Sequence, residues 1–276
     1  MRKMTRLWRG MGLELIMGVS FIITIFLLAC DQKSASPTRA GPDYPLIMPA
    51  WDFNVPVDVK REYKWDAALL TLRKMHEIGG SFDQQVELPK DLYNTVYSAL
   101  IHVYNSKLPA RDSVVSRCEV HIYCLYEPYI LNLDVDTAYQ WVKAWREGKS
   151  LTGNPAIDRL MQQYGLQLAG YWEFCWGTVS VSLRSTRPLN MSALARIFST
   201  IEGVNEAWHE PYCGGGGDDI TARAERDFWE LEYSIGWGDC PSGCGLRHFW
   251  SFRVYPNGKV EYEGSYGDPG PYGCGY

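Results

Sequence analysis

Hydrophobic side chains recur every three to four residues in several segments of the chain, a spacing typical of amphipathic helices. The pattern covers 91–105 and 137–147, continues in 155–164, and returns in a segment that begins at 191. A less regular version of the same pattern covers 65–78. We therefore predict four amphipathic helices and a fifth helix over 65–78.

The residues beside these segments predict where the helices begin and end. Asn154 and Asn190 each precede a helical pattern, and an asparagine side chain can accept a hydrogen bond from the first N–H groups of a helix. Pro155 suits the first helical position because its missing N–H would have no partner there. Gly165 and Gly203 follow the last hydrophobic positions, where a glycine commonly ends a helix.

Alternating hydrophobic and polar residues predict β-strands, most of them in the C-terminal half. The alternation is regular in 178–183 and 229–237. Two further alternating segments, 250–254 and 260–262, flank a Pro-Asn-Gly sequence, and an Asn-Gly pair is typical of a tight hairpin turn. We expect an α+β fold in which helices pack on a mainly antiparallel sheet, with a C-terminal β-hairpin.

The order of these elements predicts a single α+β globular domain over 46–276, with a possible subdivision near 150–155. Within it, 167–209 is predicted to hold two strands, a helix and a further strand through Val204. This is the order of a small plait-like unit in which one helix packs on an antiparallel sheet.

The N-terminal segment has the pattern of a sorting signal. Four basic residues lie within the first nine positions, and an uncharged apolar run follows from Leu15 to Ala29. This run is shorter than the roughly 20 residues that a helix needs to span a bilayer. A basic start followed by a short apolar run is typical of a secretory signal peptide.

The apolar run ends in Leu27-Leu28-Ala29-Cys30, which resembles the lipobox of bacterial lipoproteins. The resemblance implies that residues 1–29 are a cleaved signal peptide and that Cys30 becomes a lipid-modified N-terminus, with palmitate among its acyl groups. Residues 30–45 then form the lipidated cysteine and a tether rich in proline, serine and alanine. The anchoring membrane and its face, periplasmic or surface, stay open.

Composition and charge narrow the classes of protein that remain. With 46% hydrophobic and 21% charged residues, the chain is neither disordered nor collagen-like. The formal net charge is −5, and it becomes −8 once 1–29 is removed, since that segment holds four basic residues and one acidic residue. We therefore expect no nucleic-acid partner, and a membrane contact made through the lipid rather than through the acidic surface.

Seven of the eight cysteines follow Cys30, in a compartment that permits disulfides. Residues 119–126 alternate like a strand, which would place Cys118 and Cys124 roughly 20 Å apart, too far for a disulfide. Each would then be a buried thiol or the partner of a cysteine on another strand. Cys240 and Cys244 lie in a turn-rich segment, and one helical-type turn brings them within bridging range, so we predict that they pair. Partners stay open for Cys118, Cys124, Cys175, Cys213 and Cys274, with Cys175–Cys213 as a second possible pair.

Two residue patterns offer catalytic alternatives. Cys240, Cys244 and His248 are ligand types that zinc accepts, although no fourth ligand is evident and the spacing is wider than usual. Glu230 and Glu232 share one strand face, about 6.7 Å apart by strand rise, which suits an inverting glycosidase. A disulfide-stapled loop and a solvated strand face are the simpler interpretations. We therefore assign no catalytic residue, no metal and no cofactor.

Two surfaces are candidates for binding. Trp172 and Trp176 bracket a turn, and aromatic side chains are suited to binding sugars or peptides. Asp239 and Arg247 carry charge in the loop 238–248. The sequence GDCPSGCGLRHFW around this loop resembles a segment of uncharacterised secreted and lipoprotein-type proteins of the Bacteroidota. That resemblance implies a recurrent loop and names no role for it.

These patterns predict a lipid-anchored protein of the bacterial cell envelope whose domain is a binding or interaction module. Its partner would be an envelope protein or a glycan. The alternative is a metal-dependent or carboxylate-based hydrolase. A bound metal ion would favour the first kind of enzyme, and an activity lost in Glu230→Gln would favour the second.

Overall fold

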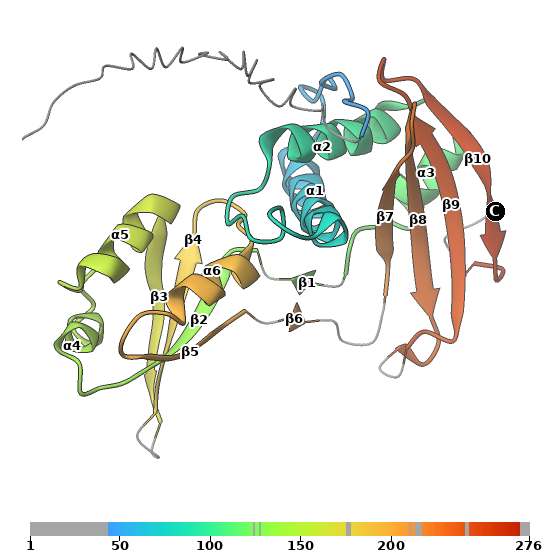
Figure 1. Ribbon diagram of the computed structural model, residues 1–276. Helices are drawn as coiled ribbons and strands as arrows, with labels where there is room; N and C mark the ends of the chain where they lie inside the picture. Colours follow the sequence, from blue (N-terminus) through green and yellow to red (C-terminus); the bar gives the residue numbers. More distant parts are fainter. Residues whose placement is uncertain are drawn as a thin grey trace, which may run out of the picture. The chain divides into compact units, whose positions relative to one another are not determined.

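The computed structural model describes residues 44–123, 125–126, 128–174, 178–209, 211–212, 217–240 and 243–270. This part of the chain contains six α-helices and two four-stranded antiparallel sheets, so the predicted α+β class is confirmed (Figure 1). None of the helices in the described ranges has the length and apolar character needed to cross a bilayer. Several predicted features lie outside the described residues: the signal peptide, Cys30, most of the tether, Cys124, Cys175, Trp176, Cys213 and Cys274.

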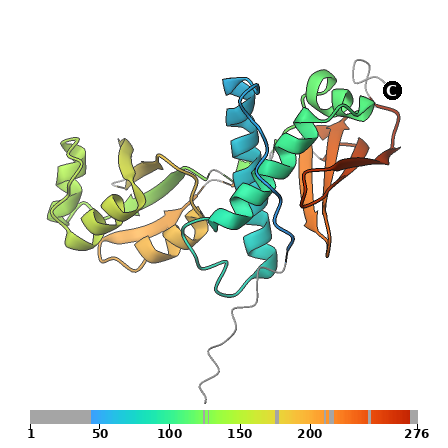
Figure 2. The same ribbon diagram turned by 90° about the horizontal axis from the view of Figure 1, so that it is seen from above.

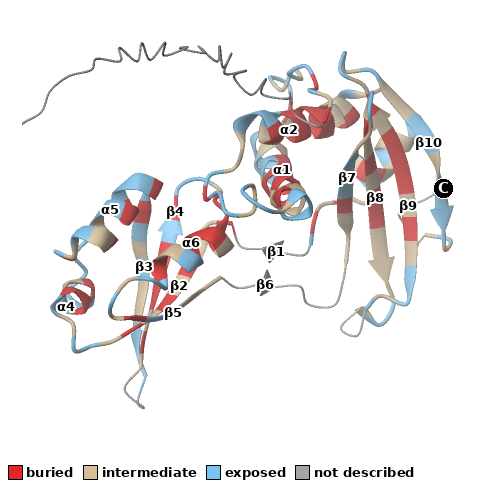
Figure 3. Cartoon of the chain, in the orientation of Figure 1, coloured by how far each residue is buried: buried red, intermediate tan, exposed pale blue. Residues whose placement is uncertain are grey.

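The first hydrophobic core lies between two helices and one sheet. Helices α1 (Val57–Ile78) and α2 (Lys90–Asn105) pack on a sheet with the strand order β10-β9-β8-β7 (Figure 2). Along the two central strands, buried residues alternate with more exposed ones; the buried residues are coloured red in Figure 3. The strands are β7 (Asp219–Ala224), β8 (Trp229–Trp237), β9 (Leu246–Val254) and β10 (Val260–Gly267). The last two form the predicted C-terminal hairpin, and Gly258 in its turn has a φ of 77°.

The second core belongs to a plait of four strands and three helices. Its sheet has the order β3-β4-β2-β5, with every neighbouring pair antiparallel. This is the arrangement of a split βαβ unit. The predicted plait-like unit is therefore present, but it begins earlier than 167, because its central strand is β2. The elements are β2 (Ile130–Val135), α4 (Gln140–Arg146), α5 (Pro155–Tyr164), β3 (Leu166–Glu173), β4 (Val179–Ser185), α6 (Met191–Phe198) and β5 (Val204–Trp208).

Two chain crossings connect the plait to the first core. The short strands β1 (Leu125–Tyr126) and β6 (Pro211–Tyr212) pair antiparallel where the chain enters and leaves the plait. Close by, the ring of Trp65 in α1 stacks on the ring of Tyr129 with centroids 5.2 Å apart. The plait is therefore an insertion within the sequence that builds the first core.

Both predicted N-terminal caps and the helix end at Gly165 are confirmed, but Gly203 does not end α6, whose last residue is Phe198. Asn154 accepts a hydrogen bond from the N–H of Ala156 at 2.9 Å, and Asn190 accepts one from Ala193 at 3.2 Å. Gly165 ends α5 with a φ of 64°, in the left-handed region that favours glycine. The bounds differ for the predicted fifth helix, since α1 begins at Val57, eight residues before the start of its hydrophobic pattern.

The predicted strand over 119–126 is wrong except for its last two residues. After the short helix α3 (Pro109–Asp112), the segment Ser113–Arg117 forms a π-helical turn, and Glu119 then adopts a φ of 45°. The N–H of Val120 donates to the carbonyl of Val114 at 2.8 Å, so the chain turns back on itself. Cys118 therefore does not begin a straight strand, and it is disulfide-bonded.

The structure describes both boundaries that the sequence predicted, the end of the tether near residue 45 and the subdivision near 150–155. Tyr44, inside the predicted tether, is buried against Trp229, whose indole N–H donates to the carbonyl of Pro45 at 2.8 Å. Residues 150–155 lie between α4 and α5, and the buried side chains of both helices belong to the same core.

Candidate functional site

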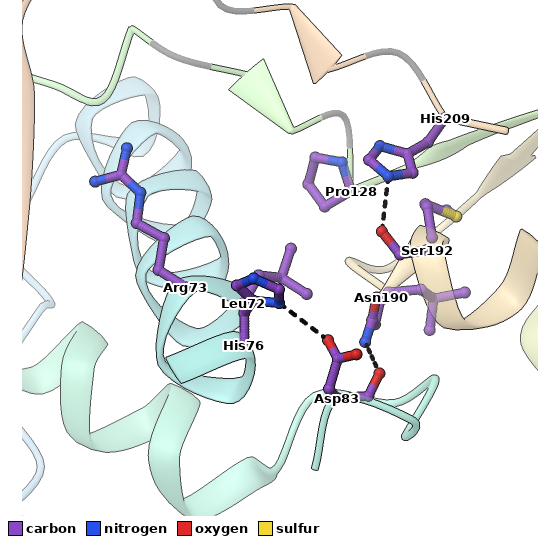
Figure 4. Close-up of a pocket in the computed structure, with 10 residues that line it drawn as sticks. Leu72, Arg73, His76, Asp83, Pro128, Asn190, Ser192 and His209 are labelled. Atoms are coloured by element: carbon purple, nitrogen blue, oxygen red, sulfur yellow. Dashed lines mark hydrogen bonds and ion pairs between the residues drawn. The ribbon is translucent and has the colours of Figure 1, made fainter. Parts of the chain in front are cut away.

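A pocket of about 160 Å³ opens beside the first turn of α6, between that turn and helix α1 (Figure 4). Most of its surface is apolar, and Leu72 of α1 and Met191 of α6 contribute to it. Among its polar side chains, His76 and Asp83 lie on one side and Ser192 and His209 on the other, and Arg73 and Asn190 complete the polar lining. A mostly apolar hollow with a few convergent polar groups is typical of a small-ligand site.

Hydrogen bonds fasten the segment between α1 and α2 to the start of α6 and so hold the pocket wall in place. The backbone N–H of Asn190 donates to the carbonyl of Val86 at 2.8 Å, and its side-chain amide donates to the carbonyl of Asp83 at 3.0 Å. Arg196, in the second half of α6, donates to the same Asp83 carbonyl at 2.7 Å. Asn190 thus caps the helix and positions the wall with one side chain.

A serine and a histidine meet at the pocket wall. Ser192 Oγ lies 2.7 Å from His209 Nε2. Ser192 is the second residue of α6, and His209 directly follows β5, the strand that packs beside this helix. The return of the chain from helix to strand therefore brings the hydroxyl and the imidazole together.

The other charged groups near the pocket are engaged with partners. Arg73 forms an ion pair with Asp219 at 2.9 Å and also donates to the carbonyl of Ile220. The Asp83 carboxylate lies 3.4 Å from His76 Nδ1 and 3.5 Å from the guanidinium of Arg196. Since each charge is balanced locally, the pocket suits a ligand without net charge better than an ion.

A second titratable cluster ties α1 to the segment after the π-helical turn. Asp66 is buried; its carboxylate lies 2.6 Å from His121 Nδ1 and accepts a hydrogen bond from the N–H of Ile122 at 2.9 Å. The other imidazole nitrogen of His121 lies 3.2 Å from the carboxylate of Glu62. This cluster joins two segments distant in sequence and does not line the pocket, so we assign it a structural role.

Of the two tryptophans predicted to bind a ligand, the structure describes Trp172. Trp172 is 50% exposed near the end of β3, where its ring folds back over Gly170 and occupies the space that a Cβ there would need. Trp176 lies outside the described residues. Whether this turn binds a ligand stays a prediction.

The predicted charged residues of the 238–248 loop differ in exposure. Asp239 is exposed. Arg247 is half-buried and donates to Ser234 Oγ at 2.8 Å and to the carbonyl of Gly217 at 2.9 Å, so its guanidinium holds the loop before β7. Burial raises the pKa of the neighbouring Asp218 to about 6, although the charge of Arg247 acts to lower it. The arginine therefore has a structural role, and the binding role of Arg247 stays a prediction.

The two glutamates of the carboxylate alternative lie on β8, away from the pocket. Glu230 is paired with Arg223, across from it on β7. Glu232 accepts a hydrogen bond from the hydroxyl of Tyr266 at 2.6 Å, which raises the pKa of that tyrosine to about 12. Each carboxylate thus has a cross-strand partner, as on a solvated sheet face.

Cys240 and Cys244 form the predicted disulfide. Because the two sulfurs are bonded to each other, they could bind zinc, as in the alternative interpretation, only after this disulfide is reduced. His248, its third predicted ligand, is buried as its strand parity indicates; its Nδ1 lies 2.7 Å from the carbonyl of Asp268, and its ring contacts Trp250.

Ser192 and His209 were not predicted from the sequence, because neither belongs to a recognisable catalytic motif. One signal was available in the sequence: the Asn190 cap places Ser192 in the first turn of a helix, and His209 directly follows the strand that returns beside that helix. Comparison with protein-family models, with curated proteins and with solved structures finds no match to the chain.

Proposed function

We propose that the chain is a lipid-anchored protein of the bacterial cell envelope that binds a small, largely apolar ligand in the pocket beside α6. The pocket is the observation that supports the binding function. An apolar cavity of about 150 Å³ accommodates a molecule the size of benzene, so a space of about 160 Å³ suits one aromatic ring or a short acyl chain. This replaces the glycan or protein partner expected from the exposed tryptophans with a small molecule.

The anchor is the part of the proposal that rests on the sequence alone. Cys30 at the end of the apolar run supports it, together with the resemblance of Leu27-Leu28-Ala29-Cys30 to a lipobox. Each buried CH₂ of an acyl chain adds about 0.8 kcal/mol, so several chains hold a soluble domain on a bilayer firmly. The anchor would keep the domain close to the membrane.

Replacing Cys30 by serine is expected to move the protein from the membrane fraction to the soluble fraction of bacteria that express it. The physical reason is that serine removes the thiol to which the lipid attaches. Fractionation with an immunoblot measures the distribution, and an alkyne analogue of palmitate reports acylation. Cys274→Ser is the matched control and should leave the protein in the membrane fraction. Full membrane retention of Cys30→Ser would contradict the anchor.

Replacing Leu72 by tryptophan is expected to abolish ligand-induced stabilisation, because the larger ring fills the pocket. In the unchanged protein, a ligand at 100 times its Kd adds about 2.7 kcal/mol to the free energy of unfolding, which raises Tm. Thermal unfolding is measured against a panel of small neutral aromatic compounds, short-chain esters and monosaccharides. Leu151→Trp, at an exposed position, should respond like the unchanged protein. The proposal fails if no panel member raises Tm, or if Leu72→Trp responds equally.

A further inference from the structure

The contact between Ser192 and His209 has the geometry of an activated nucleophile. An oxygen-to-nitrogen separation of 2.7 Å lies within the range for a serine hydroxyl that transfers its proton to a neighbouring imidazole. The pair stands at the wall of the pocket rather than in a packed core (Figure 4). We propose that the protein hydrolyses small esters, with Ser192 as nucleophile and His209 as general base. This inference rests on the proposed function, because it assigns chemistry to the same pocket.

The position of Ser192 in the first turn of α6 favours negative charge at this spot. Asn190 caps the N–H of Ala193, whereas the N–H groups of Met191 and Ser192 have no acceptor among the residues that the structure describes. Unpaired N–H groups and the helix dipole together place a partial positive charge at a helix N-terminus. They can stabilise the oxyanion that forms when a carbonyl is attacked there.

The reaction would run through an acyl-enzyme. Ser192 Oγ bonds to the ester carbonyl carbon while its proton passes to His209 Nε2. The tetrahedral intermediate collapses, the carbon–oxygen bond to the alcohol breaks, and the alcohol leaves with the proton from His209. Water then attacks the acyl carbon and gives a proton to His209. The bond to Ser192 Oγ breaks, the acid is released, and Oγ recovers the proton.

The pocket sets the substrate class. Leu72, Leu189 and Met191 provide an apolar surface for the acyl group, and the volume of about 160 Å³ limits that group to a few carbons or one ring. The charges of Asp83 and Arg73 are paired with neighbouring residues, so they do not select for a charged acyl group. The expected substrate is a neutral ester of a short-chain or aromatic acid.

The test uses the full chain, a biotinylated fluorophosphonate that labels activated serines, and p-nitrophenyl butyrate as substrate. We expect one adduct, mapped by peptide mass spectrometry to Ser192. It should be absent in Ser192→Ala and strongly reduced in His209→Gln. Hydrolysis in His209→Gln should fall by about 10²–10⁴-fold, the usual contribution of a general base. Ser199→Ala, at the other end of α6, is the matched control and should retain labelling and hydrolysis.

Two further measurements separate chemistry from folding and from binding. Leu72→Trp leaves the Ser–His contact in place but fills the pocket, so it should block the adduct even if His209→Gln folds poorly. p-Nitrophenyl palmitate should be hydrolysed far more slowly than the butyrate. The inference is overturned if Ser192 carries no adduct in the unchanged protein, or an equal one in well-folded His209→Gln. Ligand-induced stabilisation without an adduct overturns the esterase and leaves the binding function standing; absence of both overturns both.

Discussion

Replacing Trp229 by alanine is expected to lower the free energy of unfolding by about 3–5 kcal/mol, the usual cost of emptying a fully buried tryptophan site. The ring is completely buried in the first core and meets the ring of Tyr44 edge-on at 5.9 Å. Its indole N–H also fixes the carbonyl of Pro45, so the substitution releases the segment that leads into α1. Urea unfolding followed by circular dichroism measures the change.

Two further variants serve as comparisons for Trp229→Ala. One removes only part of the buried indole, and the other removes an exposed tryptophan. Trp229→Phe keeps one buried ring but removes the second ring of the indole together with its N–H, so its cost should lie below that of Trp229→Ala, at about 2 kcal/mol. Trp51→Ala removes a side chain that is 75% exposed and should change stability by no more than about 0.5 kcal/mol. Equal losses in Trp229→Ala and Trp51→Ala would refute the assignment of Trp229 to the core.

The helices and the C-terminal hairpin could be predicted because their signals are local. Asn154 and Gly165 bracket one hydrophobic stripe, and both capping groups act within one turn of the residues that they cap. The hairpin turn likewise depends on one residue that tolerates a positive φ, Gly258. In these segments the local backbone preference and the later packing agree, which is the condition for reading structure from sequence.

The segment 119–126 shows why other elements could not be predicted. Its alternation is real, and Val120 and Ile122 are both buried, as a strand would bury them. The backbone is nevertheless held by distant groups: Asp66, more than fifty positions earlier in the sequence, accepts the N–H of Ile122. An alternating pattern records which side chains are buried, and it does not record which partner satisfies the backbone.

The candidate site could not be predicted from the sequence for a related reason. Ser192 and His209 come together only because β5 returns beside α6, and the pocket also needs Leu72 from a helix more than a hundred positions earlier. The sequence predicted the helix and its returning strand but offered no means of placing α1 beside them. Long-range packing, rather than any local motif, creates the site.

Replacing His121 by alanine is expected to cost about 3 kcal/mol at neutral pH, because it leaves the buried carboxylate of Asp66 without its charged partner. Only 1% of the Asp66 side chain is exposed, whereas 27% of His121 is, so the figure belongs at the lower end for a buried pair. His76→Ala is the matched control: it breaks an exposed histidine–aspartate contact and should cost less than about 1 kcal/mol. Urea unfolding of both variants measures the difference.

The same pair makes stability depend on pH. Burial alone would lower the pKa of His121, but its hydrogen bond to Asp66 and the charges of Asp66 and Glu62 raise it, while burial raises the pKa of Asp66. Both shifts retain protons in the folded state, so the contribution of His121 is complete below about pH 6.5 and is lost as pH rises through its raised pKa. The free energy of unfolding should therefore fall as pH rises above about 6.5, and His121→Gln should flatten that fall. An unchanged slope in His121→Gln, with His76→Gln as the control, would show that the pair is not the source.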